Sequence, residues 1–208
     1  RTEEWGGFVF VNRDKHAPSI AQNLAGLAKT VDRFRMDGYQ KVLRDDFDTQ
    51  ANWKLIQENF METYHLPYVH RTTLGTQEEV GVARGFEATD AYSVYMTEKY
   101  DDSPRGHAHP TNTTLTDAWR RTTVVLAVYP TLLLILCPDH LWYFLTHPQD
   151  TASTRVCFGL SYAPEVVQDI GLAGLQAKWG PYYSQLNGED KVIVEGVQRA
   201  ARSPMVRP

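Results

Sequence analysis

The segment QENFMETYHLPYVH, residues 57–70, gathers two histidines and a carboxylate within a short stretch. Glu62 precedes His65 by three residues, and His70 follows His65 by five. On an unbroken helix, residues five apart point roughly 140° away from each other, so the two rings would not meet at one ion. Pro67 should end or kink the helix, because proline lacks an N–H and its ring collides with the preceding turn. We therefore expect the break to bring the His70 ring back beside His65.

This pair of histidines is suited to a metal, although the pair alone is not a complete site. Two neutral imidazoles suit zinc, copper, iron or nickel, and two histidines with one carboxylate form the facial triad of non-haem iron(II) oxygenases. The spacing is common by chance, so ordinary pocket or surface histidines are the simpler interpretation of the pair by itself. A zinc hydrolase with Glu62 as its base is another alternative, but the segment lacks HExxH spacing.

The composition is that of one globular domain. The chain has 208 residues, of which 42% are hydrophobic and 22% charged. Its formal net charge of -4, with no basic run, argues against a nucleic-acid partner and against an anionic membrane surface. The most apolar run, residues 123–137, is too short to span a membrane and has Pro130 at its centre. Because the start of the chain shows no signal-peptide pattern, we expect a cytoplasmic protein.

The periodicity of apolar residues predicts the secondary structure. Helical spacing covers residues 17–34, with Ser19 as the N-cap, and returns at residues 50–66, 165–186 and, after Gly188, at 189–203. Strand-like runs separated by short turns occupy residues 5–12, 39–47, 91–100, 121–129, 132–137, 140–147 and 154–162. Short turns join antiparallel neighbours. The order predicts an α+β fold, one antiparallel β-sheet with helices packed on one face.

The first segment has a wider context that points to a family. NWKLIQENFMETYHLPYVH, residues 52–70, resembles the mononuclear-iron segment of Rieske-type non-haem iron oxygenases, in the alpha subunit of the aromatic-ring-hydroxylating dioxygenase family. The match is NWK followed by E-N-F-x-E-x-Y-H-x-x-x-x-H. The resemblance implies a helix-grip-like catalytic domain and O2-dependent hydroxylation of a small organic substrate, an EC 1.14 oxidoreductase known from aromatic hydrocarbon catabolism. The form would be ring dihydroxylation, monohydroxylation or oxidative demethylation.

The resemblance also implies the third metal ligand. GEDKVIVEGVQRAARS, residues 188–203, is similar to the late helix that supplies the family's carboxylate. On that match Asp190 binds mononuclear Fe(II) together with His65 and His70. This helix resembles that of members acting on methylated amines such as betaines more than that of the naphthalene-type enzymes.

Two acids compete with Asp190 for that role. Glu189 and Glu195 are the runners-up, since the match does not fix the alignment to one residue. If the helix face that carries Asp190 and Val194 turns inward, Glu189 lies about 100° away, toward solvent. Asp190 is alternatively an acid at a helix N-terminus, where the positive end of the dipole favours it.

Two further residues receive roles near the iron. In the family, the acid at the position of Glu62 hydrogen-bonds a metal-binding histidine and links the iron to the Rieske cluster of the next subunit. A carboxylate three residues before His65 can fix the tautomer and orientation of that ring. The alternative for Glu62 is a solvated helix carboxylate. Asn59 lies where the family has an amide near the iron.

The chain departs from the family in one respect. The paired Cys and His motifs that bind a Rieske [2Fe-2S] cluster are absent. We therefore expect residues 1–208 to be the mononuclear-iron catalytic domain, as a fragment that is inactive alone, with residues 1–12 as the tail of a missing Rieske domain. The implied partners are O2, a ferredoxin or reductase as electron donor, and the other subunits of a homotrimer in the full-length protein.

A different class of function stays open. The same helix-over-sheet fold suits a metal-free module that binds a small ligand, and metal analysis would separate the two. The remaining histidines, His16, His107, His109, His140 and His147, are interpreted as solvated. The two cysteines lie in apolar, strand-like runs and are interpreted as inert buried thiols.

Overall fold

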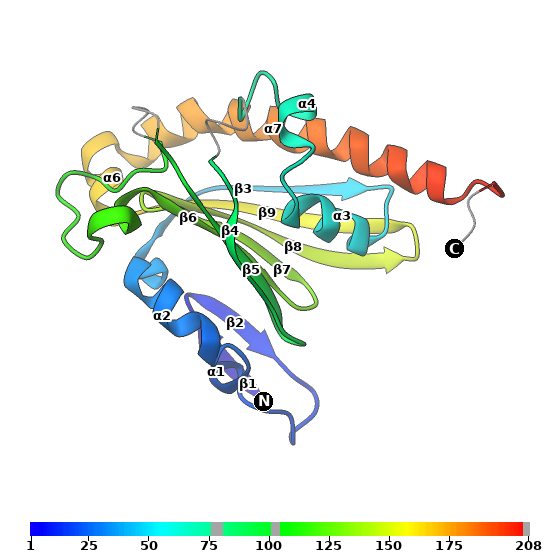
Figure 1. The fold of residues 1–208 in the computed structure, drawn as a ribbon, viewed down its shortest axis with the longest axis horizontal. Helices are drawn as coiled ribbons and strands as arrows, with labels where there is room; N and C mark the ends of the chain where they lie inside the picture. Colours follow the sequence, from blue (N-terminus) through cyan, green and yellow to red (C-terminus); the bar gives the residue numbers. More distant parts are fainter. Residues whose placement is uncertain (76–80, 101–104, 206–208) are drawn as a thin grey trace.

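A seven-stranded antiparallel sheet forms the centre of the molecule (Figure 1). The computed structural model describes residues 1–75, 81–100 and 105–205. The strand order is β3-β9-β8-β7-β6-β5-β4, and β1 and β2 form a separate hairpin. The strands are β1 Thr2–Trp5, β2 Phe8–Val11, β3 Gln40–Thr49, β4 Arg84–Ala88, β5 Tyr92–Glu98, β6 Thr122–Val128, β7 Leu132–Leu136, β8 His140–Asp150 and β9 Ser153–Tyr162.

The sequence prediction of the strands is confirmed except at one edge of the sheet and at residues 5–12, where a turn at residues 6–7 divides the predicted strand between β1 and β2 of the separate hairpin. β5 to β9 occupy the five predicted runs, and β6 and β7 are neighbours joined at residues 129–131. The edge strand β4 was not predicted, because all five of its residues are exposed and it carries no alternation of apolar and polar side chains. It pairs with β5 through an irregular register.

The helices that matter for the site lie on one face of this sheet, as predicted (Figure 1). They are α3 Trp53–Met61, α4 Leu66–Val69, α6 Pro164–Ile170 and α7 Leu172–Ala201. Phe60 of α3 and Tyr183, Leu186 and Val194 of α7 are buried in one cluster with residues of β6, β8 and β9. None of the helices in the described ranges has the length and apolar character needed to cross a membrane.

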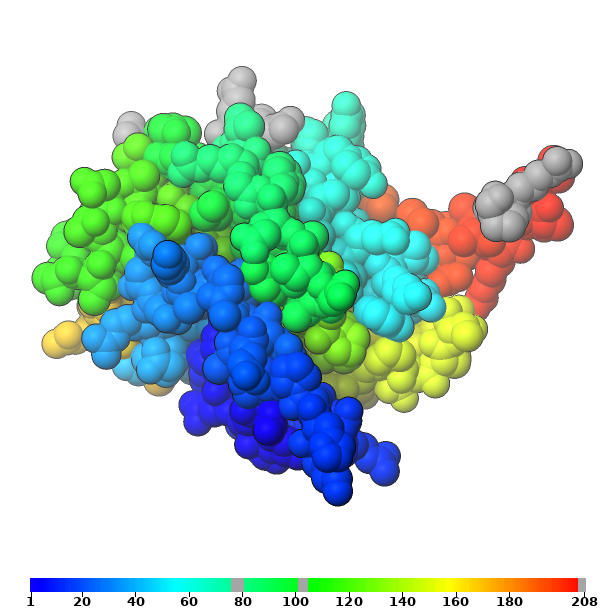
Figure 2. All heavy atoms as spheres, turned by 60° about the horizontal axis from the view of Figure 1, so that its bottom comes forward, coloured from blue at the N-terminus to red at the C-terminus, as the bar shows by residue number. Residues whose placement is uncertain are grey.

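The N-terminal segment covers the opposite face of the sheet, as Figure 2 shows in blue. The predicted helix over residues 17–34 is divided into α1 Ile20–Asn23, α2 Ala28–Val31 and 3₁₀ turns at Ala25–Leu27 and Asp32–Phe34; further turns are Met36–Gly38 and Asp117–Arg121. Ser19 is the N-cap, with a full capping box to Gln22. Gly26 packs against Tyr92, where a side chain would collide with the phenol. Tertiary packing therefore overrides the helical period here.

Two helix predictions were wrong, and both corrections affect the site. The first helix ends at Met61 with Glu62 extended, while Pro67 lies in the first turn of the new helix α4, where its missing N–H costs nothing. The second correction is that α7, which is 30 residues long, continues through Gly188 without a break. Burial of its apolar face outweighs the roughly 1 kcal/mol that a glycine costs a helix. Asp190 is consequently in mid-helix, and the N-terminal explanation for it was wrong.

Candidate metal centre

Three side chains from separate parts of the chain converge over the sheet. His65 precedes α4, His70 follows it, and Asp190 comes from α7. The Nε2 atom of His70 lies 2.9 Å from Asp190 Oδ1, and His65 Nε2 lies 3.4 Å from the same oxygen. One potential ligand atom from each of the three residues lies within 4.8 Å of the others. This arrangement has the donor types and proximity of a facial triad.

The break in the helix lies before His65 and not between the two histidines, so its predicted position at Pro67 was wrong. Met61 ends α3, the chain turns through residues 62–65, and α4 supplies a single further turn. The His65 and His70 rings then lie with centroids 5.2 Å apart at 71°. The two rings thus reach Asp190 Oδ1 from the two ends of the single turn α4.

Carboxylates engage the outer nitrogen of both rings. Glu62 contacts His65 Nδ1 and accepts a hydrogen bond from the His65 backbone N–H at 3.2 Å. Glu189 Oε2 lies 2.8 Å from His70 Nδ1. A ring whose Nδ1–H donates to a carboxylate presents Nε2 as the ligand atom. The contacts of Glu62 and Glu189 therefore favour the tautomer in which both Nε2 atoms are available for a metal.

The position of Glu189 differs from the prediction. It does not point to solvent but accepts hydrogen bonds from Thr73 Oγ1 at 2.7 Å and Gln185 Nε2 at 2.9 Å. The chain after α4 folds against α7 and covers this side of the helix, which no local pattern reveals. The other runner-up, Glu195, accepts from the Gln50 N–H at 2.9 Å and is not in the cluster of three.

Asp190 receives several hydrogen bonds in a half-buried position. Asn59 Nδ2 donates to Asp190 Oδ1 at 3.0 Å, which places the amide beside the cluster. Burial raises the pKa of Asp190, but hydrogen bonds from His65 and His70 outweigh burial and lower that pKa to about 2. Burial likewise lowers the pKa of His70, but Asp190 and Glu189 outweigh this and raise it. The site therefore holds a carboxylate anion that attracts a cation, either a proton or a metal.

A cavity opens from the cluster across the sheet. It contains about 880 Å³ of space between atoms, part of which is open to solvent. Eight of its twenty lining residues are large apolar or aromatic ones: Phe60, Leu66, Leu74, Tyr95, Val125, Ile135, Trp142 and Leu186. A concave pocket that combines apolar walls with convergent polar groups is typical of a small-molecule site.

Sequence reasoning missed the polar residues of this cavity away from the cluster. His140 was interpreted as solvated, which was wrong: it is buried, and its Nδ1 lies 2.6 Å from Asp139 Oδ1. Burial lowers the pKa of His140, but the adjacent Asp139 outweighs burial and raises it. Arg105 lines the same region. The adjacent pair Asp139-His140 at the start of β8 was the one local signal available.

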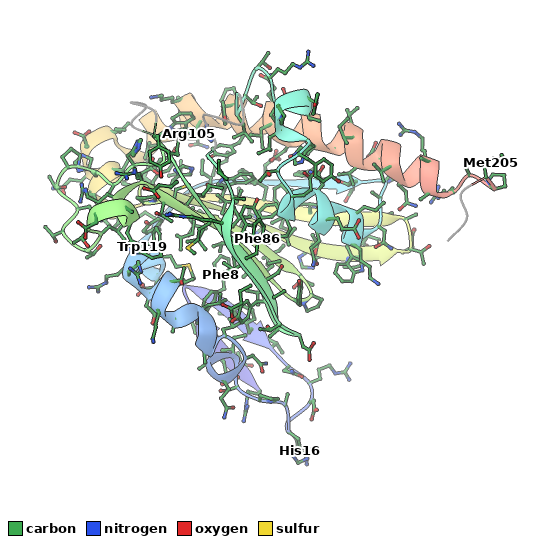
Figure 3. The ribbon with its side chains drawn as sticks, viewed as in Figure 1. Phe8, His16, Phe86, Arg105, Trp119 and Met205 are labelled. Carbon is green, nitrogen blue, oxygen red and sulfur yellow. The ribbon has the colours of Figure 1, made fainter. Side chains whose placement is uncertain are left out.

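For the other histidines and the cysteines, the observed burial agrees more closely with the predicted environment. His16 and His147 are exposed, and His16 projects from the turn beyond β2 (Figure 3). His107 and His109 are half-buried, so the prediction that their side chains are solvated was only partly correct. Both cysteines are free thiols. Cys137 is buried, whereas Cys157 is half-buried.

Comparison with known proteins identifies a family for most of the chain. The family model of the ring hydroxylating alpha subunit, catalytic domain, matches residues 36–208. The carnitine monooxygenase oxygenase subunit of Escherichia coli K12 is 39% identical over 72 residues, which are 34% of this chain and 19% of that protein. The glycine betaine monooxygenase oxygenase subunit of Chromohalobacter salexigens is 34% identical over 87 residues, which are 42% of this chain and 20% of that protein.

Solved structures share the fold. A quaternary ammonium Rieske monooxygenase, whose structure was used to study carnitine oxidation and inter-subunit electron transfer, superposes with a TM-score of 0.72 at 22% identity. The superposition covers 98% of this chain and 52% of that one. A naphthalene 1,2-dioxygenase gives a TM-score of 0.71 at 18% identity, over 98% and 53% of the two chains. The chain thus spans about half the length of these structures, and a fifth of the curated relatives is matched.

Proposed function

The chain belongs to the ring hydroxylating alpha subunit family through its catalytic domain, and from this premise we propose that it hydroxylates a small organic substrate with O2 at a mononuclear Fe(II) site. The family implies a non-haem iron and an oxidoreductase of the EC 1.14 class. We propose that His65, His70 and Asp190 are its ligands. The convergence of these three side chains on one point, with both Nε2 atoms facing Asp190 Oδ1, is the observation that carries the proposal.

The residues present fit the metal. Two imidazoles and one carboxylate are the donor set of the facial triad, which leaves open positions for O2 and substrate. Bound there, iron would activate O2 in a reaction that consumes two electrons delivered to it. Glu62 and Glu189 hold the tautomers of the two histidines, and Asn59 orients the Asp190 oxygen. The apolar cavity wall keeps bulk water from the reacting carbon.

The electrons have to come from outside this chain, which contains no Rieske motif. We propose that the 208 residues are the catalytic part of a longer subunit, with residues 1–12 as the tail of its Rieske domain, and that a ferredoxin or reductase supplies that domain with electrons. A homotrimer would let electrons cross between subunits, and Glu62 would be the connecting carboxylate, because it joins His65 and is itself only partly buried.

We also propose a methylated amine as the substrate and oxidative demethylation or monohydroxylation as the reaction. The relatives that match by sequence are named for carnitine and glycine betaine. Phe60, Tyr95 and Trp142 line the cavity, and their ring faces attract a quaternary ammonium by cation–π interaction.

The test is the iron content of the purified full-length protein after anaerobic loading with Fe(II). We expect one mononuclear iron in the wild type, and loss of at least nine-tenths of it in His65→Ala, His70→Ala and Asp190→Ala. His147→Ala is the matched control, because that histidine is exposed and should change nothing. Full iron in any of the three ligand variants would contradict the assignment. A wild type that takes up no iron, yet binds an apolar ligand, would favour the metal-free binding module.

A further inference from the structure

Arg105 is a cation in the cavity that pairs with none of the carboxylates in the described part of the chain. It lies under the first half of α7 (Figure 3) and lines the same cavity as the metal cluster. Its Nη1 donates to Tyr182 Oη at 2.5 Å and its Nη2 to Tyr183 Oη at 3.2 Å. Its Nε is buried and has no hydrogen-bond partner in the structure. Across residues 1–75, 81–100 and 105–205, no carboxylate forms an ion pair with it.

Aromatic rings surround the guanidinium and hold its plane. The Arg105 carbon Cζ lies 4.3 Å from the centroid of the Tyr182 ring and 5.1 Å from that of Trp179. Tyr182 is fixed in turn, because its hydroxyl donates to the Thr73 carbonyl at 2.9 Å. Stacking rigidifies the side chain and removes water from it, but phenol oxygens do not neutralise its charge. A desolvated cation of this kind is stabilised by an anion that arrives with a ligand.

The charges of the cavity are separated along α7. Tyr183, beside Arg105, and Asp190, in the cluster, are seven residues apart on one helix face, or about 10 Å along the axis. Glu62 and Asp190 place carboxylates at the cluster end, where they would balance a bound Fe(II), whereas Arg105 places a cation at the other end. His140 also lines the cavity, but Asp139 already pairs with it. A ligand with a carboxylate at one end and an oxidisable carbon at the other matches this polarity.

We infer that Arg105 recognises a carboxylate on the substrate and thereby places the opposite end of a short molecule at the metal cluster. The inference rests on the proposed function, since it takes this cavity to be the substrate site. The guanidinium has five N–H groups, of which one on Nη1 and one on Nη2 donate to the tyrosine hydroxyls, and a remaining N–H can form a charge-assisted hydrogen bond to a carboxylate. The substrate class is therefore a small carboxylate, in which a methylated amine, if present, faces the metal cluster.

The test compares ligand pairs that differ in the carboxylate. Binding to the iron-loaded full-length protein is measured by anaerobic calorimetry for glycine betaine against choline, and for benzoate against benzyl alcohol. We expect the carboxylate of at least one pair to bind more tightly than its neutral partner. Arg105→Met should weaken that carboxylate roughly 10- to 100-fold and leave the neutral partner within about twofold.

Two further variants serve as a control and as a substitute for Arg105→Met. Arg33→Met removes an arginine that stacks on Trp119 at 3.7 Å on the other side of the sheet, and it should leave binding unchanged. If Arg105→Met fails to fold, Arg105→Lys serves, because it retains the charge without the fork and should weaken carboxylate binding several-fold. Carboxylates that bind no better than their neutral partners, or equal losses for both members of a pair, would overturn the inference. Iron content and O2 uptake test the proposed function separately.

Discussion

At the scale of single residues, the hydrogen bond from His70 to Glu189 decides which ring nitrogen is available. Glu189 is one residue from the proposed ligand Asp190 but contacts the opposite ring nitrogen of a histidine 119 positions away. It is held there by Thr73 and Gln185. A carboxylate in this position fixes the ring orientation and raises the basicity of the ligand nitrogen.

Glu189→Gln should therefore lower iron affinity by roughly 10- to 100-fold, without removing a ligand. The amide can still hydrogen-bond but no longer stabilises the ring electrostatically. The measurement is Fe(II) affinity by competition with a chelator under anaerobic conditions. Glu195→Gln is the control, because Glu195 lies on the same helix, contacts Gln50 and should leave affinity unchanged. Equal affinities for Glu189→Gln and the wild type would remove this role.

At the scale of elements, α7 contributes Asp190 to the metal cluster and Tyr182 and Tyr183 to the surroundings of Arg105. Its interior contains Pro181 and Gly188, both of which disfavour helix. Burial of Leu175, Tyr183, Leu186 and Val194 offsets that cost. The distance between the two ends of the cavity depends on this helix remaining unbroken.

Gly188→Ala should stabilise the protein by about 0.5–1 kcal/mol, because alanine restricts the unfolded chain and the site has open space for a methyl group. The melting temperature should rise by about 1–4 °C. Gly180→Ala is the matched control: it also has open space but precedes Pro181, where a side chain disfavours the helical conformation. It should gain less or lose stability. Destabilisation by Gly188→Ala would argue that the helix breaks at this residue.

At the scale of the whole molecule, acid stability depends on a buried carboxylate at one end of the sheet. Glu98 ends β5 and pairs with Arg84 of β4 and with Arg121, both at 2.6 Å. Burial raises the pKa of Glu98, but hydrogen bonds from Arg121 and Tyr100 and the charges of the two arginines outweigh it, so the pKa is lowered. Because the pKa of Glu98 is lower in the folded than in the unfolded state, its ion pairs stabilise the fold at pH values above the unfolded pKa. This stabilisation is lost as the pH falls through the folded pKa.

Glu98→Gln should reduce the free energy of unfolding at pH 7 by about 1–2 kcal/mol, a moderate value because both arginines are half-exposed and screened. The difference from the wild type should shrink as the pH falls below about 4.5, where the unfolded glutamate is protonated. Urea unfolding from pH 7 to pH 3 measures it. Glu58→Gln, at an exposed position of α3, should show no such trend. A difference independent of pH would rule out the ionic explanation.

The sequence by itself determined the five central strands, the ends of which are marked by turn residues, and an interruption of the helix near His65 and His70, although not the position of that interruption. Both depend on neighbours within a few positions, and local periodicity and proline chemistry report such neighbours directly. Asp190 was expected from a family resemblance rather than from its surroundings. The packing of α7 on the sheet decided that Asp190 faces the histidines. The same packing decided that Glu189 faces them too.

Only the tertiary structure placed Glu189 on His70, His140 with Asp139 in the cavity wall, and Arg105 among aromatic rings of α7. These contacts join residues as many as 119 positions apart or depend on which side of a strand faces the cavity. Such contacts arise because burying apolar surface fixes how helices lie on a sheet, and polar side chains then take the partners that this packing leaves within reach. No local pattern encodes that choice.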